Sequence, residues 1–182
     1  MTFATAIRSW WFEVDRIYDR GLISGVLAKM SDNRDLVIKF YRAFDRGDFE
    51  IVRNMMSENF AAHLVGISAT LDRDEFIEFG SKFRQAFPDV CHQFDRSICE
   101  DDKVVTSGIF TGTHLGNFQG LPATGQSLSV AVMHVDRISD GKIVEHWGQG
   151  DQAGMMQQLG IVPLPGIALF YRAIRQQLGL NK

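Results

Sequence analysis

The sequence predicts an α+β fold in which a cone-shaped, curved antiparallel sheet wraps round N-terminal helices and encloses an apolar pocket. Three observations lead to this prediction. Apolar residues recur at helical spacing up to Pro88, and segments rich in β-branched and aromatic residues follow it. Of the 182 residues, 45% are hydrophobic and 14 are Phe, which is ample apolar surface for one core. Helices followed by an antiparallel meander indicate helices gathered on one face of a sheet.

The N-terminal segment, residues 1–30, is expected to be helical. Its apolar residues are spaced among charges as in an amphipathic helix, and Gly21 and Gly25 predict breaks in it. Ser31 or Asp32 can cap the helix that follows, because a short polar side chain accepts a hydrogen bond from a free backbone N–H group. The apolar positions of this second helix recur at helical spacing: Leu36, Val37, Phe40, Tyr41 and Phe44.

Polar caps and helix breakers divide the chain from there to Pro88. Gly47 ends the second helix, and Asp48 is expected to cap a shorter one. Residues 59–65 have the composition of a first strand. Asp72 is expected to cap a helix with phenylalanines along one face, which stops before the proline.

Four more strands are expected in the second half of the chain. Turn signals separate the segments 90–99, 103–114, 127–138 and 142–149. Asp140-Gly141 predicts a tight hairpin between the last two, because Asp-Gly supplies the left-handed conformations that such turns require. Asp151 can cap a following helix that Gly160 ends, and residues 167–178 are expected to form a final amphipathic helix.

Charge and composition argue against several functional classes. A net charge of −3 and a pI near 5.9 give no basic face for nucleic acid. No apolar run reaches the ~18 residues of a membrane span, and early charges argue against a secretion signal. Cys91 and Cys99 lie in one expected strand, where they cannot easily form a disulfide, so reduced thiols and a cytoplasmic location are expected.

Three stretches of the chain resemble the SnoaL-like polyketide cyclase family. They are RDLVIKFYRAFDRGDFEIVRNMMSENFAAH, then AFPDV followed by GTHLGNFQGLPATGQSL, and finally DRISDGKIVEHWGQGDQAGMMQQLG. The resemblance divides the chain into an N-terminal helical extension (1–30), a SnoaL-like domain (31–160) and a C-terminal helical extension (161–182). It implies the cone-shaped fold shared with nuclear transport factor, scytalone dehydratase and ketosteroid isomerase. It also implies a pocket that needs no cofactor, and a homodimer.

The resemblance also implies a reaction and the residues that perform it. Cyclases of this kind close a ring of an aromatic polyketide ester by intramolecular aldol condensation. In the family, an aspartate just after the Trp of an E-x-W motif acts as acid and base, and a histidine fourteen positions before it assists. His134 matches that histidine, but Gly148 follows Trp147 where the carboxylate is expected. A glycine cannot move protons, and it opens volume at the pocket wall.

Two histidines are the candidate catalytic residues. Strand alternation places Val144, His146 and Gly148 on one face, and hairpin pairing brings His134 close to His146. Such a pair could titrate near neutrality and act as base and donor. The alternative is two hydrogen-bonded wall histidines with no proton-transfer role, since neither has an obvious carboxylate partner on the same face. Asp151 and Tyr41 are possible helpers.

Several further residues are candidate ligand contacts: Tyr41, Phe44, His63, Phe83, His114, Trp147 and Gly148. His63 ends the first strand, so it either contacts the ligand or bonds to backbone groups there. His114 leads into a glycine-rich loop that either covers the pocket mouth or only makes turns. His92 is expected to be exposed. The histidine spacings match no common metal site, so no metal is expected. The family resemblance implies that no cofactor is needed.

These observations leave three functional hypotheses open. The chain could be a cofactor-independent cyclase, isomerase or hydrolase that acts on a small apolar or polyketide-like carbonyl compound. It could be a non-catalytic binding module that kept the pocket and lost the aspartate. It could also be a dimeric interaction protein whose terminal helices carry the function. An exposed sheet face and apolar terminal helices favour a homodimer in each case.

Overall fold

The computed structural model describes residues 20–160 together with residues 174 and 177. Most of the expected helix 167–178, and the first 19 residues, lie outside the described part. The elements in chain order are α2 (Arg20–Arg46), α3 (Phe49–Met55), β1 (Met56–Leu64), α4 (Arg73–Ala86), β2 (Cys91–Glu100), β3 (Lys103–Thr113), β4 (Ser127–Ser139), β5 (Lys142–Gly150) and α5 (Gln152–Gln158). The α+β class and the order of elements are as predicted.

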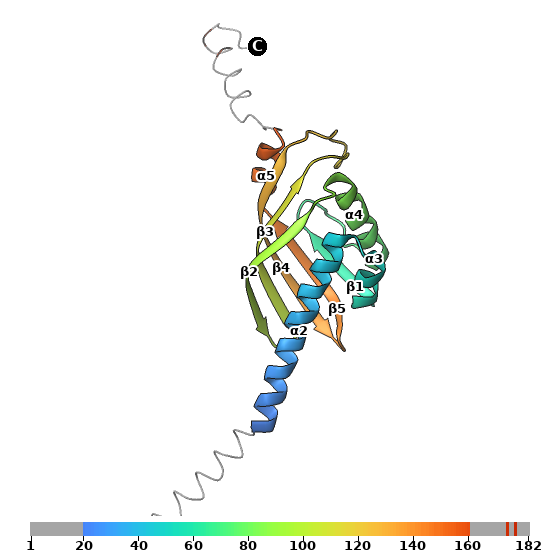
Figure 1. Ribbon diagram of the computed structural model, residues 1–182, viewed down its shortest axis with the longest axis vertical. Coiled ribbons are helices and arrows are strands. Elements are labelled where there is room, and N and C mark those ends of the chain that lie inside the picture. The colour runs from blue at the N-terminus through green and yellow to red at the C-terminus, as the bar shows by residue number, and fades with distance from the viewer. Residues whose placement is uncertain (1–19, 161–173, 175–176, 178–182) are drawn as a thin grey trace, which may run out of the picture.

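The five strands form one curved sheet in the order β1-β5-β4-β3-β2. Strands β2 to β5 make the predicted antiparallel meander, but β1 runs parallel to β5, so the sheet is mixed rather than antiparallel throughout. No short hairpin joins β1 to β5, because three strands and a helix intervene, and the direction of β1 is therefore not set by a local turn. The sheet curls round α2 without closing into a barrel, which leaves β1 and β2 as its edges (Figure 1).

Helix α2 runs without interruption from Arg20 to Arg46, so the predicted break near Gly21 and Gly25, with a new cap at Ser31 or Asp32, is wrong. One glycine costs a helix only about 1 kcal/mol, which neighbouring turns and the packing of the second half outweigh. That second half is buried against the sheet, whereas the first half extends beyond it (Figure 1). Among the helices of residues 20–160, none is both long and apolar enough to cross a bilayer.

Two of the four predicted caps, Asp72 and Asp151, have the expected side-chain hydrogen bonds. Asp72 accepts from the backbone N–H of Glu75 at 2.9 Å, and the Glu75 carboxylate accepts from the N–H of Asp72, also at 2.9 Å. Asp151 accepts from a backbone N–H in the first turn of α5. Asp48 occupies the N-cap position of α3 but makes no capping bond, because its carboxylate accepts from Arg46 Nε at 2.7 Å instead.

The core consists of two clusters, and the space between them becomes the site. One cluster lies beneath α2, α3 and β1, and it includes Phe40, Val52 and Ile143, each fully buried. The other lies between α4, α5 and strands β3 and β4, around Phe87. Phe83 packs against both clusters. The apolar space expected from the sequence lies between them, and it is open to solvent on one side rather than enclosed.

Irregularities in strand pairing bend the sheet and set which side chains face inward. The pairing of β4 with β5 shifts register after Arg137, so β5 carries one extra residue there. As a result Ile143, rather than the expected Val144, faces the core. Beyond this bulge the predicted alternation holds, and His146 and Gly148 both face inward.

Candidate active site

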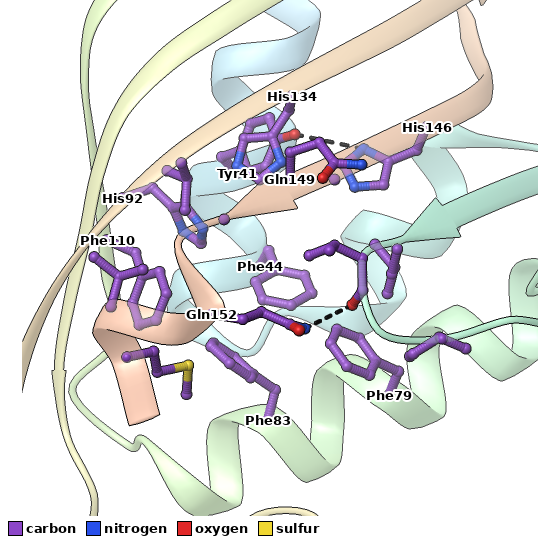
Figure 2. Close-up of a pocket in the computed structure, with 18 of the residues that line it drawn as sticks. Tyr41, Phe44, Phe79, Phe83, His92, Phe110, His134, His146, Gln149 and Gln152 are labelled. Atoms are coloured by element: carbon purple, nitrogen blue, oxygen red, sulfur yellow. Dashed lines mark hydrogen bonds between the residues drawn. The ribbon is translucent and has the colours of Figure 1, made fainter. Parts of the chain in front are cut away.

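A cavity of about 140 Å³ lies on the concave side of the sheet, between the two core clusters. An engineered apolar cavity of about 150 Å³ takes up benzene, so this one has room for an aromatic ring. The polar lining side chains include four that lie along one side (Figure 2): Tyr41, His92, His134 and His146. Phenylalanines lie across from them (Figure 2): Phe44, Phe79 and Phe83. An apolar chamber with a few convergent polar groups is the usual form of a small-molecule site.

A fully buried carboxylate holds His146 in place. Asp136, on β4, is the cross-strand partner of His146 and is 0% exposed. Its Oδ1 lies 2.8 Å from Nδ1 of His146, and its Oδ2 accepts from the Tyr41 hydroxyl at 3.2 Å. An ionised carboxylate can only accept, so Nδ1 of His146 carries a proton, and in the neutral ring Nε2 then keeps the lone pair. The expectation that neither catalytic candidate has a carboxylate partner is therefore wrong for His146.

Sequence reasoning missed Asp136, because only part of the signal for it was present. Asp136 follows His134 by two residues on the same strand, and alternation places such residues on one face. A regular hairpin that pairs Ser139 with Lys142 would set Asp136 opposite Glu145. The extra residue in β5 shifts this register by one and brings Asp136 opposite His146.

Tyr41 is a hydrogen-bond donor to this carboxylate. Burial raises the pKa of the Tyr41 phenol well above its usual value, and the charge of Asp136 and the hydrogen bond to it act in the same direction. The phenol therefore stays protonated at neutral pH. It fixes the position of Asp136 without competing for the proton on His146.

His134 is buried in the cavity wall without a hydrogen-bond partner. It is 8% exposed, and neither ring nitrogen has a partner among the described residues. Its ring lies 4.8 Å from that of Tyr41 and 5.5 Å from that of His146, measured between centroids. Burial lowers the pKa of His134 well below its usual value, and positive charge on His146 or His92 lowers it further. His134 is therefore neutral at pH 7, with one donor and one acceptor available to a ligand.

Gly148 lies close to both imidazoles. A Cβ atom built on it would lie 3.1 Å from Nε2 of His146 and 3.6 Å from Nδ1 of His134. It would also lie 2.8 Å from the tip of Leu64, a flexible side chain that would have to move aside. The position expected to carry the family's carboxylate thus adjoins both imidazoles. The volume expected to open at this glycine is instead narrowed by Leu64 and His146.

His92 is not exposed as expected, because its side chain is 8% exposed and lines the cavity. Strand β2 packs one face against α2, and alternation turns His92 and Phe94 toward that helix. Asp45 of α2 makes two hydrogen-bond contacts with His92. Its Oδ1 lies 2.6 Å from Nδ1 of the ring, and its Oδ2 accepts from the backbone N–H of His92 at 2.8 Å.

Some of the predicted ligand contacts line the cavity, and others lie outside it. Tyr41, Phe44, Phe83 and Gly148 line the cavity with the two catalytic candidates. His63 and Trp147 do not line the cavity. They pair with each other across β1 and β5, and because Trp147 is adjacent to Gly148 in the strand, both side chains lie on the opposite face of the sheet. Their rings stack 5.2 Å apart, and Nε2 of His63 lies 3.3 Å from a Glu145 carboxylate oxygen.

His114 anchors the loop after β3 and does not contact the cavity. Its fully buried ring stacks on Phe87 at 5.2 Å, and its Nδ1 accepts from the backbone N–H of Thr124 at 3.3 Å. The loop that it holds places Phe118 and Gln119 in the cavity lining, so the loop does more than turn the chain. Among the described residues, no group of His, Cys, Asp and Glu side chains is arranged to hold a metal ion.

The family model for SnoaL-like polyketide cyclases matches residues 35–159. The chain belongs to this family. Two aklanonic acid methyl ester cyclases, DnrD of Streptomyces peucetius and DauD of Streptomyces sp. (strain C5), are each 47% identical to it over 49 residues. That segment is 27% of this chain and spans 34% of DnrD and 30% of DauD, about a third of their length.

Several solved structures have a similar fold, and this chain covers nearly the whole length of each. AclR from Streptomyces galilaeus, a proposed hydroxylase, has a TM-score of 0.67 at 25% identity, over 74% of this chain and 99% of AclR. IdmH from Streptomyces antibioticus, a proposed polyketide cyclase, has a TM-score of 0.64 at 30% identity, over 70% of this chain and 98% of IdmH. A SnoaL-like protein from Jannaschia sp. CCS1 shares the fold, with a TM-score of 0.68 at 20% identity over 74% of this chain and 95% of its own. Membership in this family supports small-molecule binding or a cyclase-type function.

Proposed function

We propose that this chain binds a small, largely apolar carbonyl compound of the polyketide type and moves a proton on it, with His146 as the base. One observation carries the proposal: the buried Asp136 holds Nδ1 of His146, whose Nε2 lies beside Gly148 in the cavity lining. His134 lines the same part of the cavity with two unpaired ring nitrogens. A ligand atom at this part of the cavity comes within hydrogen-bond reach of the base.

The proposed step removes a proton from the carbon next to a carbonyl group. The C–H bond breaks, Nε2 of His146 takes the proton, and the electron pair passes into an enolate. Asp136 stabilises the imidazolium that forms, and the N–H of His134 donates to the developing oxyanion. The enolate then attacks a second carbonyl carbon or takes a proton back at another carbon. His146 thereby replaces the aspartate whose position Gly148 occupies.

The likeness to two aklanonic acid methyl ester cyclases and to a proposed polyketide cyclase supports the choice of ligand class. A homodimer in the cytoplasm, with no nucleic-acid partner, is part of the proposal. Exposed apolar side chains such as Ile98 on β2 and Met133 on β4 support the dimer. Light scattering that gave the monomer mass of 20.5 kDa would contradict it.

A second candidate is a binding module without catalytic activity. The absence of a carboxylate at Gly148 favours it, since the family's acid/base is missing there. In this case the same cavity binds its ligand and His134 only forms a hydrogen bond to it. A dimeric interaction protein is a weaker third possibility, supported by exposed Val26 and Leu27 on the projecting half of α2.

Proton exchange on a simple aryl ketone distinguishes these candidates. α-Tetralone is incubated with the protein in deuterated water, and NMR follows the loss of the protons next to its carbonyl group. We expect the wild type to accelerate the exchange and His146→Gln to slow it by about 10²–10⁴-fold, the usual contribution of a positioned base. His63→Gln, the same substitution on the other face of the sheet, serves as the control.

Thermal shift measurements on each variant establish that the ketone binds, since a ligand of the folded state raises the melting temperature. Exchange at the wild-type rate in His146→Gln would contradict the assignment of the base. Binding to the wild type without any acceleration would favour the non-catalytic module.

A further inference from the structure

His92 repeats, at a second place in the cavity, the arrangement found at His146. In both cases an aspartate holds Nδ1 of the ring, at 2.6 Å from Asp45 and at 2.8 Å from Asp136. An ionised Asp45 can only accept a hydrogen bond, so Nδ1 of His92 carries a proton, and in the neutral ring Nε2 then keeps a lone pair. Within the described part of the chain, Nε2 of His92 has no hydrogen-bond partner. The proton-transfer step proposed above does not use it.

The three imidazoles follow one another along the same side of the cavity (Figure 2). Ring centroids are 5.7 Å apart for His92 and His134, and 5.5 Å apart for His134 and His146. The ring of Tyr41 lies beside His92 and His134, at 5.3 Å and 4.8 Å. A ligand that reaches the space at Gly148 and also the His92 ring must therefore extend past His134.

Aromatic rings pack beside His92 in the cavity lining. Phe110 and Phe44 lie 6.1 Å and 6.2 Å from its ring, measured between centroids, and both line the cavity. A flat apolar body in the cavity next to His92 therefore has aromatic faces and edges to pack against. The only polar feature that His92 offers to this body is the lone pair of Nε2. A hydroxyl or enol group on the ligand satisfies it.

We infer that His92, held by Asp45, is a second polar subsite, and that the ligand is a flat aromatic compound with two oxygen functions. One is a carbonyl or hydroxyl group bound at His134 and His146, and the other is a hydroxyl or enol group that donates to His92. This inference rests on the proposed function, because it assumes that the cavity holds a small apolar ligand. It adds the chemistry of the far end of that ligand.

A structural role for His92 makes a different prediction. The two bonds to Asp45 join β2 to α2, and this role requires only Nδ1 and the backbone N–H. A purely structural His92 would lower the melting temperature when replaced, without changing the preference for ligands with a second hydroxyl group. The ratio of the affinities for two matched ligands, with and without the second hydroxyl group, therefore distinguishes a ligand-binding role of His92 from a structural one.

The test compares naphthol with a naphthalenediol that carries hydroxyl groups on both rings, using isothermal titration calorimetry on the full chain. We expect the wild type to bind the diol about three- to tenfold more tightly, as one additional hydrogen bond predicts. His92→Phe keeps an aromatic ring but has no acceptor, so it should bind the diol no more tightly than naphthol. His63→Phe, the same substitution on the opposite sheet face, should keep the gain.

A third ligand tests the inference without any substitution. Methylating the second hydroxyl group of the diol removes the donor, so the wild type should bind this ether no more tightly than naphthol. Equal affinity for naphthol and the diol, or a gain that survives in His92→Phe, would overturn the subsite but leave the proposed function standing. Failure of naphthol itself to bind would overturn the proposed function, and the subsite with it.

Discussion

The two histidines at the centre of the site differ because their neighbours differ. His146 has a buried carboxylate on Nδ1, which fixes its tautomer and stabilises its charged form during proton transfer. His134 has no partner, and burial keeps it neutral. The base and the neutral donor of the proposed step thus lie side by side, 5.5 Å apart between ring centroids. Different environments shift the pKa values of neighbouring titratable groups apart, and this is how one site comes to contain both an acid and a base.

The stability of the fold should fall as the pH drops below 6.5, the ordinary pKa of histidine. The pKa of His134 is lowered in the folded state, so the unfolded chain binds a proton that the folded chain does not. Each such proton lowers the free energy of unfolding by about 1.4 kcal/mol per pH unit, until the folded-state pKa is reached. Urea unfolding between pH 7 and pH 5 measures this slope. His134→Phe should reduce it by about one proton, and an unchanged slope would show that His134 is not the group responsible.

At the scale of single residues, strand alternation placed His146 and Gly148 on one face, and the structure has both in the cavity lining with His134. Asp136 was missed because a regular hairpin pairs it with Glu145, and only the extra residue in β5 brings it opposite His146. The burial of His92 could not be predicted from the sequence, for a physical reason. Which face of β2 is buried depends on where α2 packs, and that contact joins residues 47 positions apart. His63, His114 and Trp147 were expected at the cavity, and the structure places them outside its lining.

At the scale of elements, turn and cap chemistry predicted the strands to within three residues at each end, and Asp72 and Asp151 as caps. The errors have a common cause. The continuity of α2 through Gly25 and the parallel direction of β1 depend on tertiary packing and on long connections, which local signals do not encode.

The approach of β2 to β3 at Gly108 is the tightest backbone contact made by a glycine in the described sheet. A Cβ atom there would lie 2.0 Å from the carbonyl oxygen of Gln93 and 2.8 Å from Cα of Phe94, where the β2 register shifts. Because both neighbours are backbone atoms, Gly108→Ala must displace a strand, and we expect it to lower the free energy of unfolding by more than about 2 kcal/mol.

Urea unfolding measures this loss, and Gly25→Ala is the matched control. Position 25 is exposed on a helix with no atom within 4 Å of an added Cβ, so alanine there should change stability little or raise it by up to about 1 kcal/mol. A Gly108→Ala variant as stable as this control would contradict the close approach that bends the sheet.

At the scale of the whole molecule, the long strands β3 and β4 curve round α2 and the sheet stays open, which leaves a space between two core clusters. The α+β class and the existence of this cavity were predictable, because periodicity and family resemblance agree on them. The arrangement of three imidazoles along one side of it was not. That arrangement combines residues of β2, β4 and β5 with carboxylates from α2 and β4.

The central claim is that His146 presents an unprotonated Nε2 to the cavity. Nitrogen-15 NMR of histidine-labelled protein at pH 7 tests it directly, with the signals of His146 assigned by their loss in His146→Gln. The structure predicts a proton on Nδ1, bonded to Asp136, and a bare, pyridine-type Nε2. A proton on Nε2 at this pH would contradict the account.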